Sequence, residues 1–151
     1  MDSALPEDDM ALDMDDAATR HPASYPFLLI DKVMGMDAGV RAVGLRNVTC
    51  NDPLLAGGGR RPLTMRRALL VEAFAQLTAM ALGEDSRHPA DVEVACINSM
   101  SFTATPTPGD QIVLTVELAA EGDNTRAACK AEAGGATIAE GSIVVTKLPE
   151  A

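Results

Sequence analysis

The chain has 151 residues, of which 47% are hydrophobic and 23% charged, as in one globular domain. Its formal net charge of −10 argues against nucleic acid as the partner, because contacts to phosphates need a basic surface. No apolar run reaches the roughly 18 residues of a membrane span, and the first residues lack the order of a signal peptide. We therefore expect a cytoplasmic protein.

The N-terminal segment is the most acidic part of the chain. Met1–Thr19 contains seven acidic residues and no basic residue. This composition predicts a mobile acidic arm that is partly helical. Residues 20–151 show no internal repeat and no second domain boundary, so we expect them to form a single domain.

The segments after the arm predict two strands, one long helix and four further strands. Alternating apolar residues and turn signals place the strands at Phe27–Met36, Val40–Cys50, Val92–Thr103, Gln111–Ala120, Thr125–Ala133 and Ala136–Lys147. The Gly- and Pro-rich segment Asn51–Thr64 predicts a loop. Thr64 is suited to cap a helix that starts near Met65 and stops at Gly83.

The predicted helix is unusually apolar. From Ala68 to Leu82 only Glu72, Gln76 and Thr78 are polar, and such a helix is buried on most sides. A sheet curled around it is the simplest arrangement. Glu72 and Gln76 are four residues apart and share one face. A buried unpaired carboxylate is costly, so Glu72 is expected to be paired, protonated or used in chemistry, with capping or an arginine pair as the structural alternative.

Four of the twelve basic residues lie within eight positions just before the helix. They are Arg60, Arg61, Arg66 and Arg67. We call these four residues the arginine cluster. A solvated loop is the common role of such a run. The alternative is a docking point for an acidic or phosphate-bearing partner.

Cysteines and histidines offer little for metal or triad chemistry. Cys50, Cys96 and Cys129 are odd in number and widely spaced, which favours small, partly buried free thiols over a metal or disulfide site. His21 and His88 each stand beside a proline in a predicted loop. We expect no metal and no cofactor.

Four segments resemble, in order and spacing, the FabZ family of 3-hydroxyacyl-[acyl carrier protein] dehydratases. They are YPFLLIDKV (Tyr25–Val33), NVTCNDP (Asn47–Pro53), LLVEAFAQ (Leu69–Gln76) and PGDQIVLTVEL (Pro108–Leu118). The resemblance runs from about Tyr25 to Lys147. It implies an α+β hot-dog fold, in which a six-stranded antiparallel sheet wraps around one central helix, and a dimer or a trimer of dimers.

The chain departs from the family at the residues of catalysis. The family carries a histidine in G-H-F-P-G and a carboxylate on the central helix fourteen residues later. Glu72 matches the carboxylate, but Gly58 stands at the histidine position and the loop reads GGGRR. The family's M-P-G at the helix start is Met65-Arg66-Arg67. In the family, histidine and acid come from different subunits, so a histidine-bearing homologue is one possible partner.

The resemblance also implies the remaining site residues. Glu72 is the expected catalytic acid, and the expected substrate-binding residues are Gly57, Gly58, Gly59, Arg67 and Gln76. The arginine cluster is expected to dock an acyl carrier protein, with coenzyme A as the other possible carrier.

Three functions remain open. The first is a thioester-binding protein that lacks full dehydratase activity alone, or the acid-bearing half of a hetero-oligomer. The second is a hot-dog thioesterase that uses Glu72 as base or nucleophile. The third is an active dehydratase with a displaced base.

Overall fold

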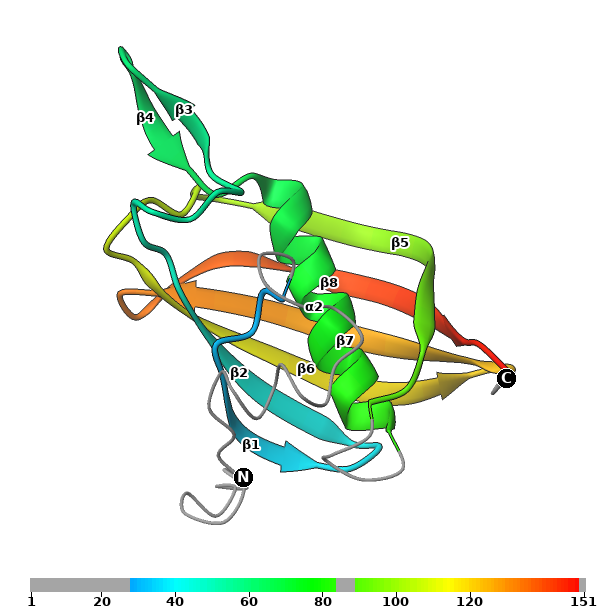
Figure 1. Cartoon of the computed structure of the whole chain (residues 1–151). Helices are drawn as coiled ribbons and strands as arrows, with labels where there is room; N and C mark the ends of the chain where they lie inside the picture. Colours follow the sequence, from blue (N-terminus) through cyan, green and yellow to red (C-terminus); the bar gives the residue numbers. More distant parts are fainter. Residues whose placement is uncertain (1–27, 84–88, 150–151) are drawn as a thin grey trace.

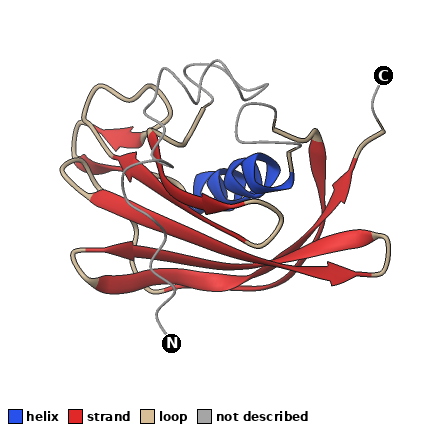
Figure 2. Ribbon diagram, turned by 90° about the horizontal axis from the view of Figure 1, so that it is seen from below, coloured by secondary structure: helices blue, strands red, loops and turns tan. Residues whose placement is uncertain are grey.

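A six-stranded antiparallel sheet curls around one helix (Figures 1 and 2). The computed structural model describes residues 28–83 and 89–149. The sheet has the order β1-β2-β6-β7-β8-β5. Its strands are β1 (Lys32–Asp37), β2 (Arg41–Asn47), β5 (Val92–Phe102), β6 (Gln111–Glu121), β7 (Asn124–Ala133) and β8 (Ala136–Lys147). The predicted α+β hot-dog fold is confirmed. The predicted acidic arm and both histidines lie outside the described residues.

The helix α2 (Arg67–Leu82) packs against the concave face of the sheet. Its side chains Leu70, Phe74 and Leu77 are fully buried. They join a core that includes Ile112, Leu114 and Val116 of β6, Ala127 and Ala131 of β7, and Ile143 and Val145 of β8. Burial of a side chain of this size typically contributes about 1.5–3 kcal/mol.

In the described residues no helix is long and apolar enough to cross a membrane.

The segment predicted as a loop contains a β-hairpin. Strands β3 (Ala56–Gly58) and β4 (Arg61–Thr64) pair with each other and not with the main sheet. The hairpin projects beyond the end of the sheet, close to the start of α2 (Figure 1). The loop prediction was wrong here. Glycines and Pro62 are typical of loops, and the two strands that contain them are too short to show an alternating pattern.

The predicted helix cap was also wrong. Thr64 ends β4, and its hydroxyl donates to the Ala56 carbonyl rather than to the helix. The N–H of Met65 donates to the Pro106 carbonyl at 2.8 Å, which keeps Met65 outside the helix. The N-cap is Arg66, in extended conformation and without a side-chain cap. The helix end at Gly83 was predicted correctly.

Strand β5 forms one edge of the sheet. Among the described residues it pairs only with β8, and most of its residues are exposed, Val94 by 38% and Ile97 by 51%. Long exposed edges with apolar side chains are normally covered by another strand or chain. No described strand covers this edge, and the start of β5 lies beside Glu72, Gln76 and Ala79 of α2.

Gly141 on β8 pairs with Met100 of β5, and the two backbones are close together there. A Cβ atom added at Gly141 would collide with the backbone of Ser99 and Met100. A backbone atom cannot move aside as the end of a side chain can, so a side chain here forces the two strands apart.

We predict that Gly141→Ala lowers the free energy of unfolding by about 1–3 kcal/mol or more. Gly44→Ala is the matched control, because its added Cβ would meet the side-chain ends of Leu77 at 3.2 Å and Ile30 at 3.3 Å, which can shift. Urea denaturation of both variants measures the difference. Equal losses in the two variants would contradict the close approach of β5 and β8.

Candidate functional site

Glu72 lies on the second turn of α2, at the rim of the helix–sheet core. Its side chain is exposed, so the expectation of a buried carboxylate was wrong. The expectation rested on the apolar residues around it, but the sheet does not cover this side of the helix's first turns. The first buried position on α2 is Leu70, and continuous burial begins at Ala73.

Gln76 connects Glu72 to the buried part of the site. It is only 3% exposed, and its side-chain oxygen accepts a hydrogen bond of 2.8 Å from the backbone N–H of Leu29. Its amide nitrogen donates to a Glu72 carboxylate oxygen at 3.2 Å. The Leu29 contact requires the amide oxygen at that end, so the nitrogen is directed toward Glu72. The predicted shared face of Glu72 and Gln76 is confirmed.

A cavity of about 460 Å³ opens beside these two residues. Helix α2 and the segment leading into β5 form its walls. The lining residues are Glu72, Ala75, Gln76, Ala79, Ala90, Asp91, Val92, Glu93 and Val94. A hydrogen bond from the Ala90 N–H to the Ala79 carbonyl, 2.8 Å long, joins the two walls.

The lining of this cavity is polar on one side and apolar on the other. Carboxylates come from Glu72, Asp91 and Glu93, and no basic residue is among the described lining residues. Ala75, Ala79 and Val92 supply apolar surface. Such a cavity suits an uncharged chain with a polar end near Glu72. Asp91 and Glu93 were missed from the sequence, because they lie about 20 residues from Glu72 along the chain with no motif around them.

The three glycines of the GGGRR loop lie in the hairpin and not in this cavity. Gly57, Gly58 and Gly59 have φ of 109°, 107° and 63°, values that L side chains rarely adopt. A Cβ on Gly57 would collide with the Pro62 carbonyl, whereas one on Gly58 would meet only Leu63 at 3.8 Å. The glycines therefore allow the tight hairpin. Within one chain they do not meet Glu72, and their predicted role in substrate binding stays a prediction.

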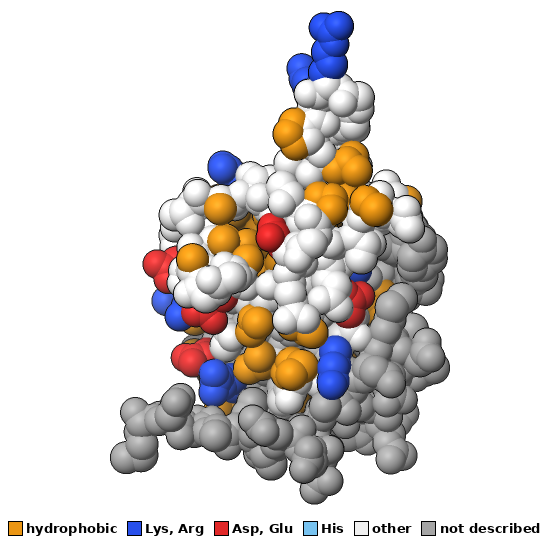
Figure 3. All heavy atoms as spheres, turned by 90° about the vertical axis from the view of Figure 1, so that its left-hand side faces the viewer, with side chains coloured by type: hydrophobic (Ala, Val, Ile, Leu, Met, Phe, Trp, Pro, Cys, Tyr) orange, Lys and Arg blue, Asp and Glu red, His pale blue; other side chains and the backbone are white. Residues whose placement is uncertain are grey.

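The arginine cluster is divided between two places. Arg60 lies in the hairpin turn and Arg61 begins β4, and Figure 3 shows basic side chains at the outer end of this projection. Arg66 and Arg67 stand at the start of α2. Arg67 places its guanidinium 5.4 Å from the centre of the Phe102 ring, a cation–π contact with the end of β5. All four residues are exposed.

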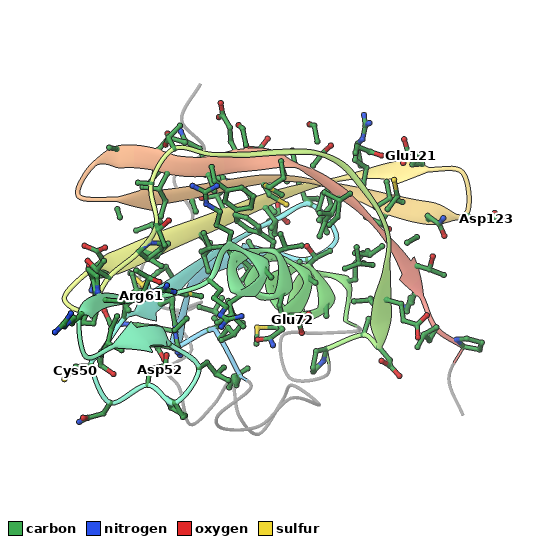
Figure 4. The ribbon with its side chains drawn as sticks, turned by 90° about the horizontal axis from the view of Figure 1, so that it is seen from above. Cys50, Asp52, Arg61, Glu72, Glu121 and Asp123 are labelled. Atoms are coloured by element: carbon green, nitrogen blue, oxygen red, sulfur yellow. The ribbon has the colours of Figure 1, made fainter. Side chains whose placement is uncertain are left out.

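A buried ion pair holds the segment that leads into the hairpin. Arg46 on β2 is 8% exposed and binds the carboxylates of Asp31, at 3.3 Å, and of Asp52. Asp52 also accepts a hydrogen bond of 2.9 Å from the Leu54 N–H. Asp52 belongs to the NVTCNDP segment, and its role as an anchor was not predicted. In the view of Figure 4, Asp52 lies on the side of the hairpin that carries Arg61 and apart from Glu72 on the helix.

The cysteines do not form a reactive site. All three are free, as predicted, but Cys50 and Cys96 are exposed rather than partly buried. Cys129 is buried, and this burial raises the pKa of its thiol to about 12, which keeps it neutral. The described residues contain no group of His, Cys, Asp and Glu side chains that could hold a metal ion.

We predict that Gln76→Leu lowers the free energy of unfolding by about 1–3 kcal/mol, because it leaves the Leu29 N–H without an acceptor. Glu72→Gln, on the exposed side of the same pair, should change stability by no more than about 0.5 kcal/mol. Urea denaturation of the two variants checks both values. A large loss in Glu72→Gln would show that the carboxylate supports the fold rather than the cavity.

Comparison with known proteins places the chain in a family. Residues 21–147 match the model of the FabA-like domain. The FabZ dehydratase of Brucella melitensis is 36% identical over 126 residues, which cover 81% of this chain and 80% of that protein. The FabZ dehydratase of Ruminiclostridium cellulolyticum is 37% identical over 125 residues, covering 81% and 87%. Among solved structures, the dehydratase heterocomplex ApeI:P from Xenorhabdus doucetiae has the same fold, with a TM-score of 0.70 and 12% identity over 92% of this chain and 93% of that one. The chain therefore belongs to the FabZ family of 3-hydroxyacyl-[acyl-carrier-protein] dehydratases, within the FabA-like hot-dog proteins.

Proposed function

We propose that this protein binds 3-hydroxyacyl thioesters carried by an acyl carrier protein and has little dehydratase activity alone. The proposal rests on the position of Glu72. Its carboxylate accepts a hydrogen bond from Gln76 and lines a cavity that has an apolar wall. The curated relatives are named as dehydratases of such thioesters. Glu72 supplies the acid of that reaction, and Gly58 stands where the family has its base.

Dehydration of a 3-hydroxyacyl thioester needs two proton transfers. A base removes the proton next to the thioester carbonyl, and an acid protonates the hydroxyl that leaves as water. In the proposal, Glu72 acts as the acid. The start of α2 has no side-chain cap, and the Leu69 N–H donates to the Arg66 carbonyl at 3.0 Å. In the proposal, the N–H groups of Arg67 and Ala68 polarise the thioester carbonyl. No histidine belongs to the described residues that line the cavity.

A second subunit would complete the site. The edge strand β5 exposes Val94, which lines the cavity, and Ile97, and a second hot-dog chain fits such an edge. By the family resemblance, the partner's histidine loop faces the acid of the first chain. In a homodimer that position holds glycine, whereas a homologue with G-H-F-P-G would supply the base. Oligomers of unlike subunits occur in this fold, as in the dehydratase heterocomplex of Xenorhabdus doucetiae.

We predict that the purified protein is a dimer or a trimer of dimers. Light scattering at micromolar concentration measures the mass directly, for comparison with 15.7 kDa for one chain. Val94→Lys with Ile97→Lys places two charges on the open strand and should shift the mass toward one chain. Met34→Lys is the control, because Met34 is also exposed, by 41%, but lies on β1 at the other edge. A wild-type monomer would contradict the proposed interface.

The expected activity is slow or absent dehydration of a 3-hydroxyacyl thioester. Loss of a general base typically costs about 10²–10⁴-fold in rate. Gly58→His should restore part of it, but a histidine at φ of 107° also strains the hairpin, by about 1–3 kcal/mol. The measurement is formation of the 2-enoyl product by wild type, Gly58→His and Glu72→Gln.

Two results would contradict this account, and each favours one alternative. Rapid dehydration by wild type that is lost in Glu72→Gln would indicate a displaced base, and Asp91→Asn, Glu93→Gln and His88→Ala would then identify it. Release of free thiol from a saturated acyl thioester, lost in Glu72→Gln, would indicate a thioesterase. The three carboxylates around the cavity are the observation that favours this second candidate.

A further inference from the structure

The arginine cluster carries positive charge at the hairpin and at the start of α2, and no carboxylate in the described part of the chain balances it. No carboxylate of residues 28–83 or 89–149 forms an ion pair with any of its four arginines. The N-terminus of a helix already carries a partial positive charge, so Arg66 and Arg67 are unfavourable there without an anion. The packing of Arg67 on Phe102 leaves its charge uncompensated. The cluster therefore favours an acidic ligand.

The same chain contains an acidic segment that could neutralise the four arginines. Met1–Thr19 carries seven of the 22 acidic residues and none of the twelve basic ones. The rest of the chain has 15 acidic residues spread over 132 positions by subtraction, so the segment is the largest local source of negative charge.

The described chain begins at Leu28, beside the helix that carries Arg66 and Arg67 at its start. The Leu29 N–H is bound to Gln76 on α2, at 2.8 Å, and this fixes where the chain reaches the helix. From Gln76 back to Arg67 is nine residues along the helix, or about 14 Å at 1.5 Å per residue. The ten residues from Thr19 to Leu29 span up to about 33–36 Å when extended. The acidic residues can thus reach Arg66 and Arg67 without disturbing the fold.

We propose that the acidic segment Met1–Thr19 docks on the arginine cluster of its own chain and competes there with an acidic carrier. The docking itself follows from charge and reach, while the competition rests on the proposed function. Because the segment is tethered, its effective concentration at the cluster is of the order of millimolar, and weak docking is enough to occupy it. A cluster that is occupied in nine of ten molecules binds an external ligand about tenfold more weakly.

The test uses the full-length chain with a neutralised segment. In this variant Asp2, Asp8, Asp9, Asp13, Asp15 and Asp16 become Asn and Glu7 becomes Gln. A synthetic peptide of residues 1–19 is titrated into it by fluorescence anisotropy at two salt concentrations. We expect saturable binding that weakens with salt, and binding to wild type about tenfold weaker because its own segment occupies the cluster.

A matched pair of variants locates the binding. In the neutralised background, Arg60→Gln, Arg61→Gln, Arg66→Gln and Arg67→Gln should weaken peptide binding by about tenfold or more. The control removes four basic residues elsewhere, by Lys32→Gln, Arg126→Gln, Lys130→Gln and Lys147→Gln, and should change it less than about threefold. Absence of peptide binding, or equal effects of the two sets, would overturn the proposal.

Binding of an acidic carrier protein tests the competition separately. The neutralised variant should bind an acyl carrier protein several-fold more tightly than wild type does. Equal affinities would overturn the competition. If no variant binds the carrier, the proposed carrier is wrong, and the proposed competition is wrong as well. The peptide titration still decides whether the segment docks.

Discussion

The packing of the apolar helix α2 into the concave face of the sheet determines where every other part of the molecule lies. Phe74 and its buried neighbours hold the helix with one side against β2, β5, β6 and β7. The side that the sheet does not reach carries Glu72, and β5 forms an open edge beside it. The cavity is therefore a consequence of incomplete wrapping. Its polar end is kept in place by Gln76, whose oxygen is held by Leu29 and whose nitrogen contacts the carboxylate.

Much of this fold was predictable because it depends on local patterns. Alternation placed β8 at its observed bounds, Ala136–Lys147, and the apolar run predicted α2 within two residues. The failures involve contacts between distant segments. Thr64 looked like a cap, but pairing within the hairpin and the Met65–Pro106 hydrogen bond delay the helix start. Glu72 looked buried because periodicity reports the apolar surface of a helix but not how far a sheet extends over it.

The part of the candidate site that depends on local spacing was also predictable. Glu72 and Gln76 share a helix face, which their spacing of four residues indicated. Asp91 and Glu93 reach the cavity only because the Ala90–Ala79 hydrogen bond brings the start of β5 to the helix. The glycines of the hairpin were identified by resemblance, whereas their positive φ angles show what they do locally. They permit a tight turn that supports Arg60 and Arg61, and this turn is independent of the cavity within one chain.

The central claim is that the cavity binds a 3-hydroxyacyl thioester while the chain lacks a base to dehydrate it. One proton NMR experiment tests both parts, with a 3-hydroxyacyl thioester of pantetheine added to the purified protein. The account predicts that the acyl resonances broaden with wild type and that no vinyl signals of a 2-enoyl product accumulate over hours. Sharp, unshifted resonances at all protein concentrations would contradict binding, and prompt appearance of vinyl signals would contradict the missing base.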